Sequence, residues 1–348
     1  MLFLTLVAIL ALVSLPTPSA SQEANTTVPL PLPVRVINTN GQDCLSDEMR
    51  ETVQNEINQD IQNLTRNTII PTLCGGQSRA SPAASCSALS ANCPSDSYWV
   101  RSSNGPAVQV YCDMNRVCGC SSTGGWTRVA NLNMRDPSQQ CPGAWIPQTR
   151  SSEPRRLCGR GSGGAGCLSA VYSTYGISYN QVCGRVIGYE INSADAFGLF
   201  AGGSQTIEGP YVDGVSLTHG SPGTRQHIWS FAAGISQISL IFLSADSCPC
   251  VGGMAAPSYV ANDYFCESGN SGGLAILSTF YASDPLWDGQ GCGSPPCCEL
   301  TSPPGVTAPW FCKQLPQATT NDIEARICGD EDTSNEDTPV EHIELYIR

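Results

Sequence analysis

Long hydrophobic runs are absent from this 348-residue chain after its first 20 residues. A membrane-spanning helix needs about 20 consecutive apolar residues, so the sequence argues against a membrane span. Basic residues are also scarce, because 17 Lys and Arg stand against 30 Asp and Glu, which gives a net charge of −13. Nucleic acids and anionic membrane surfaces repel such a chain, so both are poor candidates as partners.

Charged side chains are missing altogether from residues 1–20, whose apolar run extends from Leu2 to Val13. That run is too short to cross a bilayer and small residues follow it, which is typical of a secretory signal peptide cleaved after Ala20. Removing these 20 residues from 348 leaves 328, enough for one large domain with an N-terminal extension or for two domains. We therefore expect a secreted, extracellular protein.

Cysteine, in contrast, is abundant, with 19 residues. In an oxidising compartment these predict disulfides. Close pairs such as Cys118 and Cys120 would suit zinc in a cytosolic protein, but the two-plus-two spacing with histidine partners is missing. The odd number leaves at least one cysteine that is free or bonds a second chain.

The segment before the cysteine-rich body divides into two parts. Residues 21–42 are polar and Pro-rich, include the glycosylation sequon at Asn25, and predict a disordered linker. Residues 43–73 predict an amphipathic helix, with a second sequon at Asn63. The apolar stripe either docks on the protein's own body or forms a coiled-coil stalk that makes homo-oligomers. Its residues are Met49, Val53, Ile57, Ile61 and Leu64.

From Cys86 onward, Gly, Ser, Pro and aromatic residues dominate, and short β-prone runs alternate with turns. The fold class that we predict is α+β: a β-rich, disulfide-stapled head preceded by an N-terminal amphipathic helix. The clearest strand candidates are Val108–Tyr111, Trp126–Ala130, Val182–Ile191, His227–Phe231, Ile238–Leu243 and Ile343–Ile347.

Residues 86–134 read CSALSANCPSDSYWVRSSNGPAVQVYCDMNRVCGCSSTGGWTRVANLNM. This stretch resembles the opening subdomain of the fibrinogen-related C-terminal domain, which intelectin-type lectins share. The resemblance implies a bridge between Cys86 and Cys112. Asn104-Gly105 would supply a tight turn between strands, and Gly124-Gly125 would allow a close backbone approach ahead of a strand that starts at Trp126.

Residues 135–348 depart from typical fibrinogen-related domains and predict a β-rich, cysteine-containing domain continuous with the opening subdomain. They resemble a group of uncharacterised secreted proteins of corals, anemones and sponges, through stretches such as Asp284-Pro-Leu-Trp-Asp-Gly and Trp310-Phe-Cys-Lys-Gln-Leu-Pro. The aspartate-rich calcium loop of the fibrinogen-related family is not found. The resemblance therefore implies an extracellular protein of a class that binds glycans or proteins, and it assigns no ligand residue.

Two of only three histidines, His219 and His227, fall within one short stretch. If its Gly-Ser-Pro-Gly segment is a turn between two strands, both lie near one another and near Ser216, Asp213 and Arg225. Such a group permits a metal site or a Ser/His/Asp arrangement. Neither a Gly-x-Ser-x-Gly elbow nor a His-Glu-x-x-His helix is present. We favour polar side chains that stabilise a hairpin, with ligand contact by His219, Arg225 and His227 as the alternative.

An acidic run near the C-terminus has the oxygen spacing of an EF-hand loop. Asn335 stands where glycine is usual and Pro339 would disrupt an exiting helix, so a solvated acidic turn is the competing interpretation. The cofactor that the run would bind is Ca²⁺, with Asp330, Asp332, Ser334, Glu336 and Glu341 as ligands.

Exposed aromatic rings in turn-rich loops are the other candidate ligand surface. Trp287 and Trp310 are the best placed, although such rings in a β-rich domain are often core. The function that we predict is a secreted recognition protein that binds glycans or extracellular proteins through loops. The alternative is an acidic component of an extracellular or skeletal matrix, and we do not expect an enzyme.

Overall fold

The structure, a computed structural model, divides into two compact units, Met1–Leu64 and Thr65–Arg348. The residues that the structure describes are 51–52, 55–56, 58–60, 74–103, 105–115, 117, 124–150, 153–161, 164–189, 197, 206–233, 256–267, 310–329 and 338–348.

In the first unit, the described residues 51–52, 55–56 and 58–60 have helical backbone and are largely exposed. The apolar stripe expected on this helix lies outside the described residues, as do the expected signal peptide, the linker and both sequons. The amphipathic helix and its coiled-coil stalk therefore remain predictions. Within the described part of the chain, no helix combines the length and the hydropathy that a membrane crossing requires.

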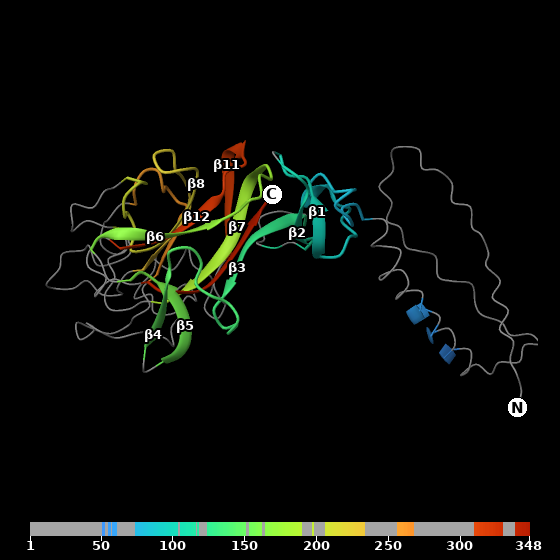
Figure 1. Cartoon of the computed structure of the whole chain (residues 1–348), viewed down its shortest axis with the longest axis horizontal. Coiled ribbons are helices and arrows are strands. Elements are labelled where there is room, and N and C mark those ends of the chain that lie inside the picture. Colours follow the sequence, from blue (N-terminus) through green and yellow to red (C-terminus); the bar gives the residue numbers. More distant parts are fainter. Residues whose placement is uncertain are drawn as a thin grey trace, which may run out of the picture. The chain divides into compact units, whose positions relative to one another are not determined.

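The second unit is β-rich, as predicted, and its described part forms two sheets (Figure 1). The strands are β1 (Asp96–Val100), β2 (Val108–Asp113), β3 (Trp126–Asn133), β4 (Ile146–Arg150), β5 (Glu153–Gly159), β6 (Gly166–Tyr172), β7 (Tyr179–Gly188), β8 (Gly214–His219), β9 (Gln226–Ala233), β10 (Tyr264–Glu267), β11 (Phe311–Thr319), β12 (Ile323–Gly329) and β13 (Val340–Ile347).

The eight-stranded sheet is organised around the C-terminal strand β13, which lies between β3 and β7. Beyond β3 the sheet continues through β2 to β1, and beyond β7 it continues to β11. The β4–β5 hairpin joins at the start of β13, where Val340 faces Cys158. Ile343 pairs with Leu132 on one side and with Val186 on the other, so apolar side chains meet across three strands.

The five-stranded sheet has the order β10-β9-β8-β12-β6 and is antiparallel except for the β9–β10 pair. All seven residues of β12, which lies between β8 and β6, are buried. Because side chains alternate along a strand, Ile323, Ala325 and Ile327 enter the main hydrophobic core, and the residues between them point to the opposite face.

The two sheets share one hydrophobic core. Trp229 of β9 stacks on Phe311 of β11 with ring centroids 4.5 Å apart and an interplanar angle of 10°. On β7, Gly188 gives room to Phe231 of β9, whose ring lies 2.6 Å from where a Cβ atom would be. The chain therefore packs sheet against sheet, and burial of these large rings supplies a main part of its stability.

Disulfides staple the unit at several points within its described residues. Cys74–Cys93 and Cys141–Cys158 close short loops, and Cys167–Cys328 joins the directly paired strands β6 and β12. Cys183 and Cys312 are also disulfide-bonded. The expected use of cysteine for disulfides is therefore confirmed.

The region that resembles the fibrinogen-related opening contains the expected Cys86–Cys112 bridge. The expected strands at Val108–Tyr111 and Trp126–Ala130 lie within β2 and β3. Asn104 lies outside the described residues, so the tight turn expected at Asn104-Gly105 remains a prediction. Gly124 and Gly125 lie against the backbone, as expected: a Cβ on Gly124 would be 1.8 Å from the Met114 carbonyl oxygen.

The substitution Gly124→Ala tests this close approach. We expect it to lower the free energy of unfolding by at least about 2 kcal/mol, because backbone must move to admit the methyl group. Gly75→Ala is the matched control, since nothing lies within 4 Å of its Cβ position. Urea unfolding of the oxidised proteins, followed by tryptophan fluorescence, measures both. Equal stabilities for the two variants would contradict the packing described.

Candidate functional site

The histidine-bearing stretch forms the predicted hairpin, with β8 and β9 joined by the turn at residues 220–225. A register shift places Leu217 opposite Trp229 and Thr218 opposite His227, so Ile228 is an extra residue in β9. This bulge turns His227 to the same face as Ser230, and the His227 Nε2 atom lies 2.8 Å from the Ser230 Oγ atom. Without the bulge, strand alternation would point these two side chains to opposite faces.

The face of the five-stranded sheet that points away from the main core is unusually polar. Strand pairing aligns Ser169, Arg326, Ser216 and Ser230 in one row across β6, β12, β8 and β9. The next row contains Glu324, Thr218 and His227. Every one of these residues on β8, β9 and β12 is buried. We call these two rows the polar face.

Tyrosines from two other segments cover the end of the polar face near β9. The Tyr211 hydroxyl bonds to the Ser216 hydroxyl and lies 3.0 Å from the Ser230 Oγ atom. The Tyr259 ring packs edge-on against Tyr211 at 5.2 Å and against His227 at 6.2 Å. Ser216, Ser230 and Tyr211 are at most 1% exposed. A Ser–His contact is therefore present, but no nucleophile in it is open to a substrate.

Burial sets the protonation state of His227. The side chain is 9% exposed. Desolvation, together with the positive charge of Lys313, lowers the His227 pKa from 6.5 to about 3. Its imidazole is therefore neutral at physiological pH, and it acts as a hydrogen-bonding group within the polar face.

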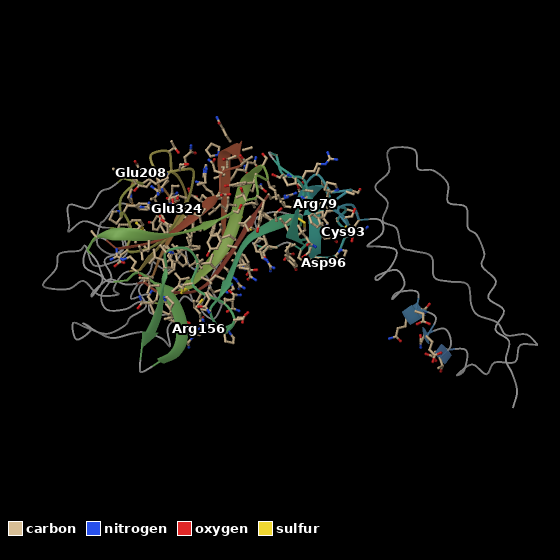
Figure 2. All side chains as sticks on the ribbon, in the orientation of Figure 1. Arg79, Cys93, Asp96, Arg156, Glu208 and Glu324 are labelled. Carbon is tan, nitrogen blue, oxygen red and sulfur yellow. A yellow bond between two sulfur atoms is a disulfide. The ribbon has the colours of Figure 1, made fainter. Side chains whose placement is uncertain are left out.

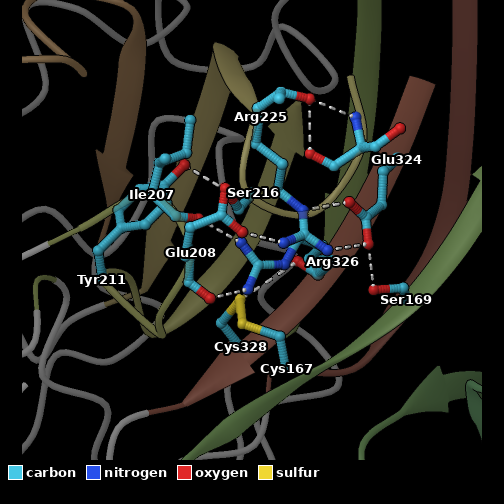
Figure 3. Close-up of polar contacts among 12 residues, drawn as sticks. Cys167, Ser169, Ile207, Glu208, Tyr211, Ser216, Arg225, Glu324, Arg326 and Cys328 are labelled. Carbon is cyan, nitrogen blue, oxygen red and sulfur yellow. Dashed lines mark hydrogen bonds and ion pairs between the residues drawn. A yellow bond between two sulfur atoms is a disulfide. The ribbon is translucent and has the colours of Figure 1, made fainter. Parts of the chain in front are cut away.

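The other end of the polar face is held by one arginine (Figure 3). Arg225, from the β8–β9 turn, donates from Nε to a Glu324 carboxylate oxygen at 2.6 Å and from Nη2 to the other oxygen at 3.1 Å. Its remaining nitrogen pairs with Glu208. Ser169 also donates to Glu324. Burial alone would raise the Glu324 pKa, but the hydrogen bonds from Arg225 and Ser169 hold it below its usual value.

Arg326 fixes the segment that contains Ile207 and Glu208 to the same sheet. Its guanidinium donates to the backbone carbonyls of Ile207 at 2.7 Å and of Glu208 at 3.1 Å. Glu208 and Glu324 therefore lie around the two arginines, as Figure 3 shows. Figure 2 shows where the same two glutamates lie in the chain. Two arginines and two glutamates balance in formal charge, which is the condition for burying such a group.

Three turns meet at this end of the five-stranded sheet. Ile323, the first residue of β12, pairs with His219 at the end of β8 and with Tyr172 at the end of β6. The turns that adjoin these strand ends are residues 173–177, 220–225 and 320–322, and we call them the turn cluster. Thr174 donates its backbone N–H to Asp322 at 2.8 Å and its hydroxyl to the Thr320 carbonyl at 3.0 Å. Hydrogen bonds therefore join two turns of the cluster, 173–177 and 320–322, to each other.

The predicted ligand residues are separated by the fold. Arg225 and His227 both lie at the polar face, but the neighbouring pairs Thr218–His227 and His219–Gln226 put His219 on the other side of the hairpin. Trp310 packs beside Tyr346, and the Arg185 guanidinium lies 4.8 Å from the centre of its ring. Trp287 lies outside the described residues.

The predicted calcium ligands fall mainly on undescribed positions, because 330–337 are outside the described residues. Glu341 is described, and it is 2% exposed on β13. One of its oxygens accepts from Arg135 Nη2 at 2.8 Å and from the Tyr189 hydroxyl at 3.2 Å, and the other faces Arg155 at 3.4 Å. In this arrangement the carboxylate neutralises arginine charge. Among the described residues, no group of three or more His, Cys, Asp and Glu is placed to hold a metal ion.

Sequence reasoning did not identify Glu324, Arg326, Tyr211 or Tyr259. The signal for the first two was present in Ile323-Glu-Ala-Arg-Ile-Cys, where charged and apolar residues alternate as in a strand.

Comparison with protein-family models gives no match to this chain, and comparison with curated proteins gives none either.

The neutral state of His227 predicts a specific acid sensitivity. Its folded pKa, about 3, lies below the unfolded value near 6.5, so its stabilising contribution is complete above pH 6.5 and decreases as the pH falls. We expect wild type to lose up to about 1.4 kcal/mol per pH unit, relative to His227→Gln, between pH 6.5 and 5. Urea unfolding of both proteins across this range measures the difference. A constant difference would show that His227 titrates normally.

The two partners of Arg225 offer a matched pair of substitutions. The side chain of Glu324 is 9% exposed and that of Glu208 is 38% exposed. We expect Glu324→Gln to lower the free energy of unfolding by about 3 kcal/mol. The substitution removes the buried negative charge that pairs with Arg225, whose side chain is only 11% exposed. Glu208→Gln should lower it by less than about 1 kcal/mol. Denaturant unfolding at pH 7 compares them, and equal losses would contradict the assignment of Glu324 as the principal partner.

Proposed function

We propose that this chain is a secreted recognition protein that binds glycans or extracellular proteins through turns at one end of its β-rich body. The turn cluster is the single observation that carries this proposal. Binding loops lose less entropy when they are already ordered in the free protein. Here three turns are fixed to a disulfide-bonded framework by Arg225, Asp322 and the backbone around Thr320.

Burial of the Ser–His contact favours binding over hydrolysis. A nucleophilic serine must reach both its base and the substrate. Ser230 touches His227 but has no exposed surface, and the same is true of Ser216 beside Tyr211. The roles that fit these side chains are support of β8 and β9 and exclusion of water from the sheet.

The proposal also includes features from the sequence. Three of these features are typical of extracellular proteins. They are secretion, glycosylation at Asn25 and Asn63, and a fibrinogen-like opening at residues 86–134. A helical stalk over residues 43–73 would join several heads, which would raise the avidity for repeated ligands. Calcium held by the acidic run at 330–341 would be an additional structural element.

A glycan array probed with the full-length, oxidised protein tests the proposal, with and without calcium and beside an array of extracellular matrix proteins. We expect saturable binding to a restricted set of ligands. Reduction of the disulfides should abolish that binding, because the turns lose their framework. The reduced protein is the control for adhesion by charge alone. Unsaturable binding that survives reduction would favour an acidic matrix component instead.

A further inference from the structure

One residue of the turn cluster has a strained backbone. Tyr175 has a φ angle of +55° and the following Gly176 has +67°. The Ile177 N–H donates to the Thr174 carbonyl at 2.9 Å, which closes a four-residue turn around them. Two consecutive positive φ angles define a type I′ turn, whose first central position favours Asn, Asp or Gly. A bulky aromatic residue there is an outlier that the surroundings must enforce.

The surroundings do enforce it. Asp322 accepts from the Thr174 N–H at 2.8 Å, and the Ser173 hydroxyl accepts from the Tyr175 N–H at 3.0 Å. On the far side of the turn, the Gly176 carbonyl accepts from the Ser103 N–H at 2.9 Å. Three residues, Asp322, Ser173 and Ser103, thus hold a backbone conformation that tyrosine disfavours.

The ring is available to a ligand. Tyr175 is 44% exposed, and only Ile146 and Val171 are comparable large exposed apolar residues in the part of the chain that the structure describes. Ile146 belongs to β4 in the other sheet. Val171 lies on β6, four residues before Tyr175. Among the described residues, this region therefore exposes one aliphatic side chain and one ring, which is less apolar surface than a tight protein interface requires.

Exposed polar residues also belong to the turns and the loop that contact the turn containing Tyr175. Asn321 and Asp322 are exposed in the adjoining turn, and Ser103 is exposed in the loop that contacts Gly176. An exposed aromatic residue together with a carboxylate, an amide and a hydroxyl residue in the adjoining turns fits a sugar, which has an apolar C–H face and a rim of hydroxyl groups. The carboxylate of Asp322 and the net charge of −13 disfavour anionic sugars.

We propose that Tyr175 is the stacking residue of a binding site for a neutral sugar, with Asp322 and Asn321 as hydrogen-bonding partners of its hydroxyl groups. This inference rests on the proposed recognition function and deepens it, because it names the ligand class and the contact residue. The strained turn presents the ring in one orientation and so lowers the entropy lost on binding.

The experiment compares Tyr175→Asn with Tyr175→Phe on an array of immobilised neutral mono- and disaccharides. Asparagine tolerates positive φ but lacks the ring. We expect Tyr175→Asn to bind the sugars that wild type binds at least tenfold more weakly and to melt about 2–4 °C higher. Tyr175→Phe should stay within twofold of wild type in binding and should not melt higher. Opposite changes in binding and stability identify the ring as a ligand contact held at a cost to folding.

Ile146→Asn is the matched control, since Ile146 is 43% exposed and lies outside the turn cluster. It should leave binding unchanged. If Tyr175→Asn binds the wild-type sugars equally well, the site assignment is wrong but the recognition function stands. If wild type binds only extracellular proteins, the sugar site is likewise overturned while recognition survives. If wild type binds no ligand on either array, both the site and the proposed function fail.

Discussion

The buried carboxylate of Glu324 is the constraint on which the arrangement of the five-stranded sheet depends. A charge in the centre of a sheet is costly unless it is paired and hydrogen-bonded. Arg225 satisfies both oxygens of Glu324, and Ser169 bonds to one of them. Because Arg225 is the last residue of the β8–β9 turn, the pairing also sets the position of that turn. One electrostatic requirement therefore connects strands β6, β12 and β8 and orders the end at which the turns meet.

Much of the fold could be predicted from the sequence, but unevenly. Strands β2, β3 and β13 contain β-branched and aromatic residues in short runs, which is the ordinary signal. β11 was not predicted because it includes Pro316, which cannot donate to a neighbouring strand. The structure accommodates it because, among the described strands, β11 pairs with β7 alone and has a register shift between Gln314 and Thr319. Such a strand is recognisable only once its place at a sheet edge is known.

The candidate site was harder to predict than the fold. The sequence indicated a hairpin around Arg225 and His227, and that hairpin exists. Which side chains share a face depended on the extra residue Ile228, and a bulge of one residue has no reliable sequence signal. Glu324 was missed because its partner lies 99 residues away. Alternation of charged and apolar residues in β12 is equally typical of a strand with one solvated face, so only the long-range pairing reveals that both faces are buried.

The buried and exposed parts of this region have complementary physical roles. The residues of the polar face on β8, β9 and β12 are buried, and hydrogen bonds among them and to Tyr211 hold the strands in register. The groups that a ligand can reach lie in the turns beyond it, where Asp322 secures the turn that contains Tyr175. Both parts depend on β12, since Asp322 immediately precedes it and Glu324 belongs to it. A strained turn persists only when its anchor does not move. The buried charges around Glu324 are therefore not a second site but the reason that the surface at the strand ends can be rigid.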